Sequence, residues 1–181
     1  MNKKQQKQGE IEIDVLDKII NNFRKQQPDM GLPQNIFHFI SRSTPVVNVD
    51  LLIKDSQNNV LLSWRDDEFA GSAWHIPGGI VRFKETLEQR LNKVADLEIG
   101  CSIEYNPVPL CIEEVLLDRD TRSHFISFLY ACRLSSDTFK PSNKNLCETD
   151  AGYLKWHKGC PENLVEVQKM YRSHIENVQL I

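Results

Sequence analysis

Residues 85–98 carry a helical period, and a carboxylate stands in the middle of its apolar stripe. At about 100° per residue, Leu91 and Val94 lie within about 40° of Leu87, and Glu98 falls between them. A carboxylate in that position is costly unless it is paired, hydrogen-bonded or bound to a metal. Either Glu98 has such a partner, or the helix frays before it and the side chain turns to water.

Strand-like segments surround this helix. Residues 46–65 are expected to form a hairpin, because the run VVNVDLLIK and the run VLLSWR flank the turn SQNN. Short strands are expected at 73–77 and 80–83. The longer strands 110–118 and 124–134 are joined by the charged loop RDTRS, and GYLKWH is a last short strand.

Three further helices are predicted at the two ends of the chain. Residues 10–26 form an amphipathic pattern, Pro33 can start a short second helix, and Pro161 can open a C-terminal helix. The order predicts an α+β fold, with a mixed β-sheet sandwiched between helices and an extra N-terminal helix. Residues 1–31 are expected to be an extension with a disordered start, and 32–181 the domain. The exposed apolar stripe of the first helix could pack on a second subunit, so a homodimer is expected.

Composition argues against several classes of protein. The formal charge of -3 does not predict a basic surface that would bind a nucleic-acid backbone. The 5 cysteines are odd in number and none stand at C-x-x-C spacing, which argues against a disulfide framework and a structural zinc site. Reduced thiols in a cytoplasmic protein are the simple interpretation. No stretch approaches the roughly 20 apolar residues of a membrane span.

The turn before the helix suits a ligand. Pro77-Gly78-Gly79 lets the backbone turn sharply and approach a bound group closely. A carbonyl exposed there can coordinate a hard cation, and Mg2+ takes oxygen ligands from one or two carboxylates plus substrate phosphates. A glycine turn alone is more often a plain turn than a site.

The spacing from this turn through the helix is more specific. Gly79, Glu85, Glu98 and Gly100 stand at four of the seven glycine or charged positions of the motif G-x5-E-x7-R-E-U-x-E-E-x-G-U. Lys93 replaces the arginine conservatively. Residues 79–101 therefore resemble the Nudix box.

Two losses within the box suggest a branch of that family. Val94 and Leu97 replace glutamates that usually bind metal. The chain resembles the GDP-mannose mannosyl hydrolase group, which also lacks them, and residues 42–53, 60–65 and 74–79 follow that group's pattern. The resemblance covers roughly residues 32–157. It implies Mg2+ or Mn2+, a nucleotide-diphosphate sugar that is GDP-linked, and attack at the anomeric carbon to release GDP and free sugar.

The resemblance also assigns roles to individual residues. Glu98, the carbonyl of Gly78 and Asp150 would bind the metal, and Arg65 would contact the diphosphate. The other implied site residues are Asp50, Arg82 and Phe125, which would contact substrate, and His124, which opens a strand facing the site. Without the resemblance, Arg65 could be a strand-end surface charge, Asp50 a buried hydrogen-bonding residue and His124 an edge residue. Glu85 and Lys93 would form a structural ion pair.

Several positions depart from the group's pattern. Ile80 stands where the group has an arginine, and Arg82 could substitute for it from the same face of a strand. Phe125 lacks the hydroxyl of a substrate-contacting tyrosine. Ala151 stands at the position of the histidine that acts as general base. Glu148 or Asp150, in the same loop, could take over that proton transfer.

These departures leave three functions open. The first is a metal-dependent nucleotide-sugar hydrolase. The second is an ordinary Nudix diphosphatase that cleaves the P–O–P bridge, against which the missing glutamates count. The third is a Nudix domain that has lost catalysis and only binds a nucleotide sugar or a protein partner, which the missing histidine favours.

Overall fold

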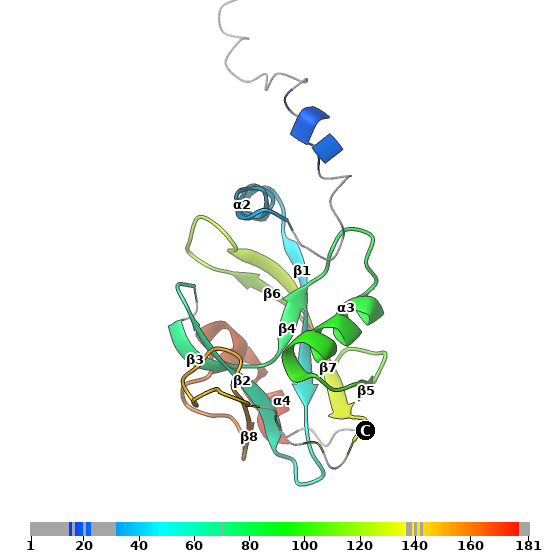
Figure 1. Cartoon of the computed structure of the whole chain (residues 1–181), viewed down its shortest axis with the longest axis vertical. Helices are drawn as coiled ribbons and strands as arrows, with labels where there is room; N and C mark the ends of the chain where they lie inside the picture. The colour runs from blue at the N-terminus through cyan, green and yellow to red at the C-terminus, as the bar shows by residue number, and fades with distance from the viewer. Residues whose placement is uncertain are drawn as a thin grey trace, which may run out of the picture.

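The strands form two sheets (Figure 1). The five-stranded sheet contains, in spatial order, β4 (Gly78–Ile80), β1 (Val46–Ile53), β7 (His124–Leu134) and β5 (Ile103–Tyr105), and β6 (Cys111–Leu116) also pairs with β7. The three-stranded sheet has the order β3 (Gly71–His75), β2 (Val60–Asp67) and β8 (Leu154–His157). The computed structural model describes residues 15, 17–19, 21–22, 32–69, 71–136, 139, 141 and 143–177.

Strand β1 is central to the larger sheet. It runs parallel to β7 from the pair Val46–Phe125 to the pair Ile53–Cys132. On its other edge it is antiparallel to β4, where Asp50 lies opposite Gly78. The sheet is therefore mixed, as the sequence predicts.

The predicted hairpin over residues 46–65 is wrong in its pairing. The turn after β1 is present, but β1 and β2 belong to different sheets and share only a bridge between Lys54 and Val60. Both edges of β1 are occupied by β4 and β7, and both edges of β2 by β3 and β8. The chain therefore crosses between sheets at this turn.

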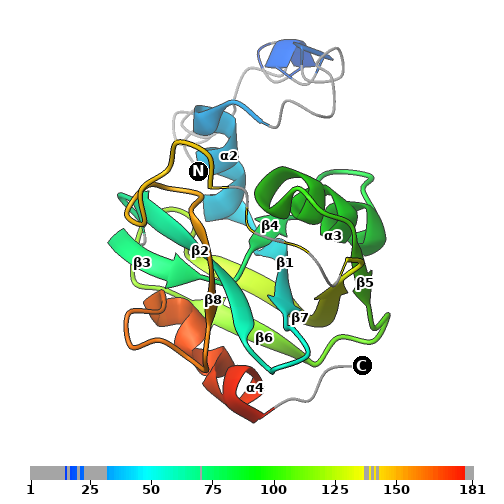
Figure 2. The ribbon, with the colours of Figure 1, turned by 60° about the horizontal axis from the view of Figure 1, so that its bottom comes forward.

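Helices cover both sides of the strands (Figure 2). Val49, Leu51 and Ile53 of β1 pack with α3 (Leu87–Val94), in a cluster that includes Leu91. Leu52, on the other face of β1, packs with Tyr171 and Ile175. Those two residues come from the 3-10 helix η3 (Glu166–Tyr171) and from α4 (Arg172–Asn177). The predicted sandwich of helices about a mixed sheet is confirmed.

Helix α3 begins later than predicted because a capping box sets its start. The backbone N–H of Gln89 donates to Thr86 Oγ1 at 3.1 Å, and the backbone N–H of Thr86 donates to Gln89 Oε1 at 2.8 Å. Each side chain satisfies a donor that the first helical turn leaves unpaired. The helix therefore starts at Leu87 and not at Glu85.

The end of this helix changes the position of Glu98. Residues Ala95–Ile99 form a π-helical turn, η2, closed by a hydrogen bond from the N–H of Gly100 to the carbonyl of Ala95 at 2.9 Å. The wider turn shifts the phase of the side chains that follow. Ile99 enters the core at 4% exposure, whereas the side chain of Glu98 is 31% exposed. Glu98 is thus at the edge of the apolar stripe, and the helix has not frayed.

The predicted helices at the ends of the chain are found in part. Helix α2 (Gln34–Ser43) follows Pro33 as expected. The C-terminal helical segment begins at Glu166, several residues after Pro161. Of the predicted helix 10–26, the described positions 15, 17–19, 21 and 22 are helical and exposed, and the rest of that prediction lies outside the described residues. Within the described part of the chain, no helix is long and apolar enough to cross a bilayer.

Candidate active site

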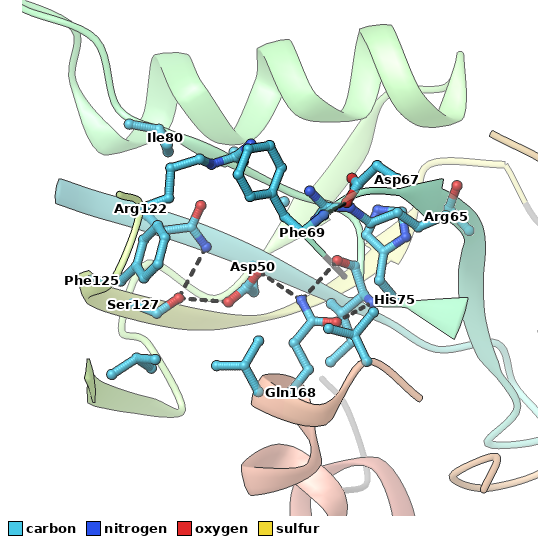
Figure 3. Close-up of a pocket in the computed structure, with 18 of the residues that line it drawn as sticks. Asp50, Arg65, Asp67, Phe69, His75, Ile80, Arg122, Phe125, Ser127 and Gln168 are labelled. Carbon is cyan, nitrogen blue, oxygen red and sulfur yellow. Dashed lines mark hydrogen bonds and ion pairs between the residues drawn. The ribbon is translucent and has the colours of Figure 1, made fainter. Parts of the chain in front are cut away.

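An open pocket of about 1200 Å³ is bounded by residues of both sheets, of α2 and of the segment before α4. Its central region is drawn in Figure 3. Of the residues that the sequence assigns to the site, six contribute to the pocket wall. They are Asp50, Arg65, Gly78, Arg82, Glu98 and Phe125.

Asp50 lies at the base of this pocket in a buried hydrogen-bond network. Its carboxyl group accepts hydrogen bonds from Ser127 Oγ at 2.6 Å, Tyr171 Oη at 3.1 Å and Gln168 Nε2 at 3.2 Å. The residue is only 3% exposed, and burial raises the pKa of its carboxyl group. The network joins β1, β7 and η3, so Asp50 links three elements that line the pocket. This geometry fits the alternative of a buried hydrogen-bonding residue, and contact with substrate stays a prediction.

The Tyr171 hydroxyl should contribute measurably to stability. Tyr171→Phe is expected to cost about 1–3 kcal/mol in the free energy of unfolding, because it removes a hydrogen bond from a buried carboxyl group. Urea denaturation with a two-state fit measures the change. The control is Tyr153→Phe, since the Tyr153 hydroxyl forms no hydrogen bond within the described residues. Equal stability of the two variants would show that the bond to Asp50 contributes nothing.

Glu98 faces a histidine across the pocket wall. Its Oε2 lies 3.7 Å from Nε2 of His75, which belongs to β3. The Nδ1 atom of His75 is buried and has no hydrogen-bond partner in the described part of the chain. Leu97, which replaces one of the box glutamates, is 71% exposed, and Val94 is buried at 3%. Glu98 is therefore the residue of this helix whose carboxylate borders the pocket.

Gly78 lines the pocket, and its carbonyl is not bonded to the neighbouring strand. The bonds from Leu51 N to Pro77 O and from Val81 N to Val47 O, each 2.9 Å, define which pairs of the β1–β4 ladder are hydrogen-bonded. Alternate pairs are not hydrogen-bonded, so the pair of Asp50 and Gly78 leaves its carbonyls directed away from the partner strand. The Gly78 carbonyl is therefore not used by β1.

These donors fit a hard divalent ion. Mg2+ keeps several waters and uses one or two carboxylates together with substrate phosphates. Glu98 and the Gly78 carbonyl, on the wall of a pocket wide enough for a phosphate ligand, are a donor set of that kind. No group of three or more His, Cys, Asp or Glu side chains that could hold a metal occurs among the residues the structure describes.

The predicted structural ion pair takes a different partner. Glu85 pairs with Arg90 at 2.6 Å, and it does not take the predicted Lys93 as its partner. Arg90 is 8% exposed, and its Cδ would lie 3.4 Å from a Cβ atom placed on Gly79. The arginine reaches from α3 back to the glycine turn, which brings its guanidinium group to Glu85.

Arg65 and Arg82 are both on the wall but differ in their surroundings. Arg65 Nε donates a hydrogen bond to Asp67 Oδ2, so the guanidinium is held by a carboxylate two residues away. Arg82 is exposed and lies beyond the end of β4, which stops at Ile80. The expectation that Arg82 projects from the same strand as Ile80 is therefore wrong, although both residues line the pocket.

The residues expected to move protons lie apart from this wall. Ala151 lines the pocket, whereas Glu148 pairs with Lys155 at 2.5 Å and Asp150 accepts a hydrogen bond from Cys147 N at 2.7 Å. His124 Nε2 lies 3.0 Å from Glu114 Oε1. None of Glu148, Asp150 and His124 belongs to the pocket lining found among the described residues. Their catalytic roles, and the metal role of Asp150, stay predictions.

Sequence reasoning missed several residues of the pocket. His75 stands within the segment W-H-I-P-G-G, but nothing in that pattern marks it as a neighbour of Glu98. Arg119 and Arg122 belong to the loop RDTRS. The charge of this loop is evident in the sequence, but the sequence does not show that the loop faces the pocket. Gln168 lies in the predicted C-terminal helix. The apolar spacing of that helix predicts core positions on either side of Gln168 and no role for Gln168 itself.

Comparison with solved structures identifies the fold. A Nudix hydrolase from Nitrosomonas europaea matches with a TM-score of 0.51 and 16% identity, covering 75% of this chain and 82% of that one. A MutT Nudix hydrolase from Burkholderia pseudomallei matches with a TM-score of 0.56 and 20% identity, covering 70% of this chain and 95% of that one. A MutT protein from Methanosarcina mazei Go1 matches with a TM-score of 0.54 and 18% identity, covering 73% and 94%.

The chain has the Nudix fold. At these identities the likeness extends to the fold alone. No protein-family model matches the chain. A curated relative, the low-salt glycan biosynthesis protein Agl8 of Haloferax volcanii, is 38% identical over 77 residues, which are 42% of this chain and 49% of the relative. The match thus spans about half the length of that protein.

Proposed function

We propose that this chain is a Nudix hydrolase that uses Mg2+ or Mn2+ to release GDP and a free sugar from a GDP-linked nucleotide sugar. The observation that carries the proposal is the single carboxylate of the box helix on the wall of a pocket that is also lined by Gly78, whose carbonyl β1 does not use. The description of the Haloferax volcanii relative as a glycan biosynthesis protein is consistent with a sugar-linked substrate.

One carboxylate favours breaking the bond between sugar and diphosphate. Glu98 and the Gly78 carbonyl would hold the ion, and Arg65 would bind the diphosphate beside it. Bound there, the ion supplies charge stabilisation to the diphosphate as it leaves. Val94 is buried and Leu97 is apolar, so neither of these two box positions offers a ligand for a further ion that could activate water against phosphorus.

The isotope position in the products tests this directly. Hydrolysis of GDP-mannose in 18O-labelled water with Mg2+ is expected to place the label in the free sugar and none in the nucleotide. Mass spectrometry of the separated products measures it. Free mannose and GDP, each incubated in the same labelled water, control for exchange of the anomeric oxygen and of the phosphate oxygens. Label in GMP or in sugar phosphate would overturn the bond assignment and indicate an ordinary Nudix diphosphatase.

A second candidate is a Nudix domain that binds a nucleotide sugar without hydrolysing it. The specific observation in its favour is Ala151 on the pocket wall, where the resemblance expects a histidine base, with Glu148 paired to Lys155 instead. Calorimetric titration with GDP-mannose and Mg2+ distinguishes the two. Binding with no products after prolonged incubation would replace the hydrolase by this candidate.

A further inference from the structure

Arg122 has an unusual backbone conformation that neighbouring groups hold in place. Its φ is 53°, in the left-handed region that residues other than glycine rarely adopt. Arg119 Nε donates to the Arg122 carbonyl at 3.0 Å, and the Arg122 N–H donates to Ser41 Oγ at 3.3 Å. Ser41 is itself buried, at 3% exposure. Such conformations persist where the surroundings enforce them, and they gather at functional sites.

The guanidinium group of Arg122 lies over two aromatic rings. It lies 4.5 Å from the ring centre of Phe69 and 5.6 Å from that of Phe37, both within cation–π range. Figure 3 shows Arg122 beside Phe69. A ring against the face of a guanidinium leaves its N–H donors pointing outward in its plane, which is the geometry that binds a carboxylate or a phosphate in two places at once.

No hydrogen bond or ion pair holds this guanidinium group among the described residues, although the charges of Asp67 and Glu68 attract it. Arg122 Nε is buried and without a hydrogen-bond partner, and no ion pair of Arg122 is found within the described residues. Arg65 differs, because Asp67 holds it. Burial, and next the positive charge of Arg65, lower the pKa of Arg122, whereas the charges of Asp67 and Glu68 oppose that shift. A partly desolvated cation without an ion-pair partner is costly, and a bound anion would reduce that cost.

Arg122 and Glu98 reach the pocket from different elements of the fold. Glu98 comes from η2, on the α3 side of the sheets. Arg122 contacts Phe37 and Ser41 of α2, at another part of the same pocket wall. With a volume of about 1200 Å³, the pocket has room for a ligand that extends between the two.

We propose that Arg122 is an anion site that binds an acidic group on the sugar of the nucleotide-diphosphate ligand, in addition to the diphosphate. The inference rests on the proposed function, since it places the diphosphate at Glu98 and Arg65. The chemistry recognised is an oxyanion, the carboxylate of a sugar acid or a phosphate on the sugar. Arg119 is a positioning residue, because it acts by holding the loop that presents Arg122.

A pair of matched ligands tests the site without catalysis. GDP-mannose and GDP-mannuronate differ by one carboxylate, and calorimetric titration with EDTA present measures their dissociation constants without turnover. The wild-type chain is expected to bind GDP-mannuronate roughly 10- to 100-fold more tightly, because charge-assisted hydrogen bonds are worth about that factor. Arg122→Gln should bring the ratio of the two constants close to one. Inorganic phosphate, added as a competitor, should weaken GDP-mannuronate more than GDP-mannose.

The control and the opposing outcomes keep the two proposals separate. Arg133→Gln removes an exposed arginine paired with Glu104 at the far end of β7, and should leave the ratio unchanged. Thermal unfolding verifies that both variants are folded. A wild-type ratio near one, or a ratio unaffected by Arg122→Gln, would overturn the sugar-acid site while the hydrolase proposal stands. Binding of neither ligand, with or without Mg2+, would overturn both.

Discussion

Glu98→Gln is expected to slow hydrolysis of the nucleotide sugar by at least about 100-fold. Loss of residues that merely support metal ligands typically costs 10- to 100-fold in metal affinity or activity, and a ligand itself should cost no less. The substitution keeps the shape of the side chain and removes the one carboxylate by which the box helix borders the pocket. Steady-state rates at saturating Mg2+ measure the effect on turnover, and Mn2+ titration by electron paramagnetic resonance measures the effect on binding.

Asp96→Asn is the matched control. Asp96 lies in the same π-helical turn, is exposed and loses the same charge. Its rate and its Mn2+ affinity are expected to stay within about 2-fold of the wild type, since surface charges of this kind contribute little. Wild-type turnover and Mn2+ affinity in Glu98→Gln would show that Glu98 is not a metal ligand.

The strand runs were predictable, but their partners were not. The segments VVNVDLLI and VLLSW are almost continuously apolar, which is typical of strands buried on both faces. That pattern predicts burial without choosing a neighbour, and the turn SQNN favoured the nearest one. The true partners come from far along the chain, β7 for β1 and β8 for β2. A local sequence pattern contains no information on that pairing.

The helix illustrates the limit of periodicity. Its apolar period correctly placed Leu91 and Val94 in the core, at 1% and 3% exposure. A constant 100° per residue also put Glu98 in that stripe, and the π-helical turn moved it to the edge. A left-handed Gly100 closes that turn at φ 73°, and one glycine after a helix predicts an end without predicting a wider turn.

The residues of the pocket wall also divide into those that the sequence predicts and those that it does not. Glu98, Gly78 and Arg65 line it as expected, because motif spacing records geometry within a short stretch of chain. Gln168 and Arg122 lie on the wall through long-range contacts. Gln168 bonds to Asp50 of β1, and Arg122 lies over the Phe37 ring of α2. Only the packing of α2 and η3 on the sheets brings them together.

Gly78→Ala is expected to destabilise the chain by roughly 3 kcal/mol or more, at the upper end of the cost of overpacking. A Cβ atom at this position would lie 2.4 Å from Asp50 Oδ1 and 2.7 Å from the carbonyl oxygen of Val49. The Val49 carbonyl belongs to the backbone of a strand paired on both edges, so it cannot withdraw without breaking ladder hydrogen bonds. Asp50 is held by three hydrogen bonds to neighbouring side chains and is equally unable to move.

Gly79→Ala separates this clash from the general effect of removing a glycine. Both changes restrict the unfolded chain in the same way, so their difference reports the folded state. At Gly79 the Cβ atom would meet Val94 Cγ2 at 2.9 Å and Arg90 Cδ at 3.4 Å, both side-chain atoms that can shift. Urea denaturation of the two variants should therefore show Gly78→Ala as the less stable by at least about 2 kcal/mol. Equal midpoints would mean that the close approach of β4 to Asp50 does not constrain this turn. A side chain would then fit at residue 78, beside the carbonyl that is proposed to bind the metal.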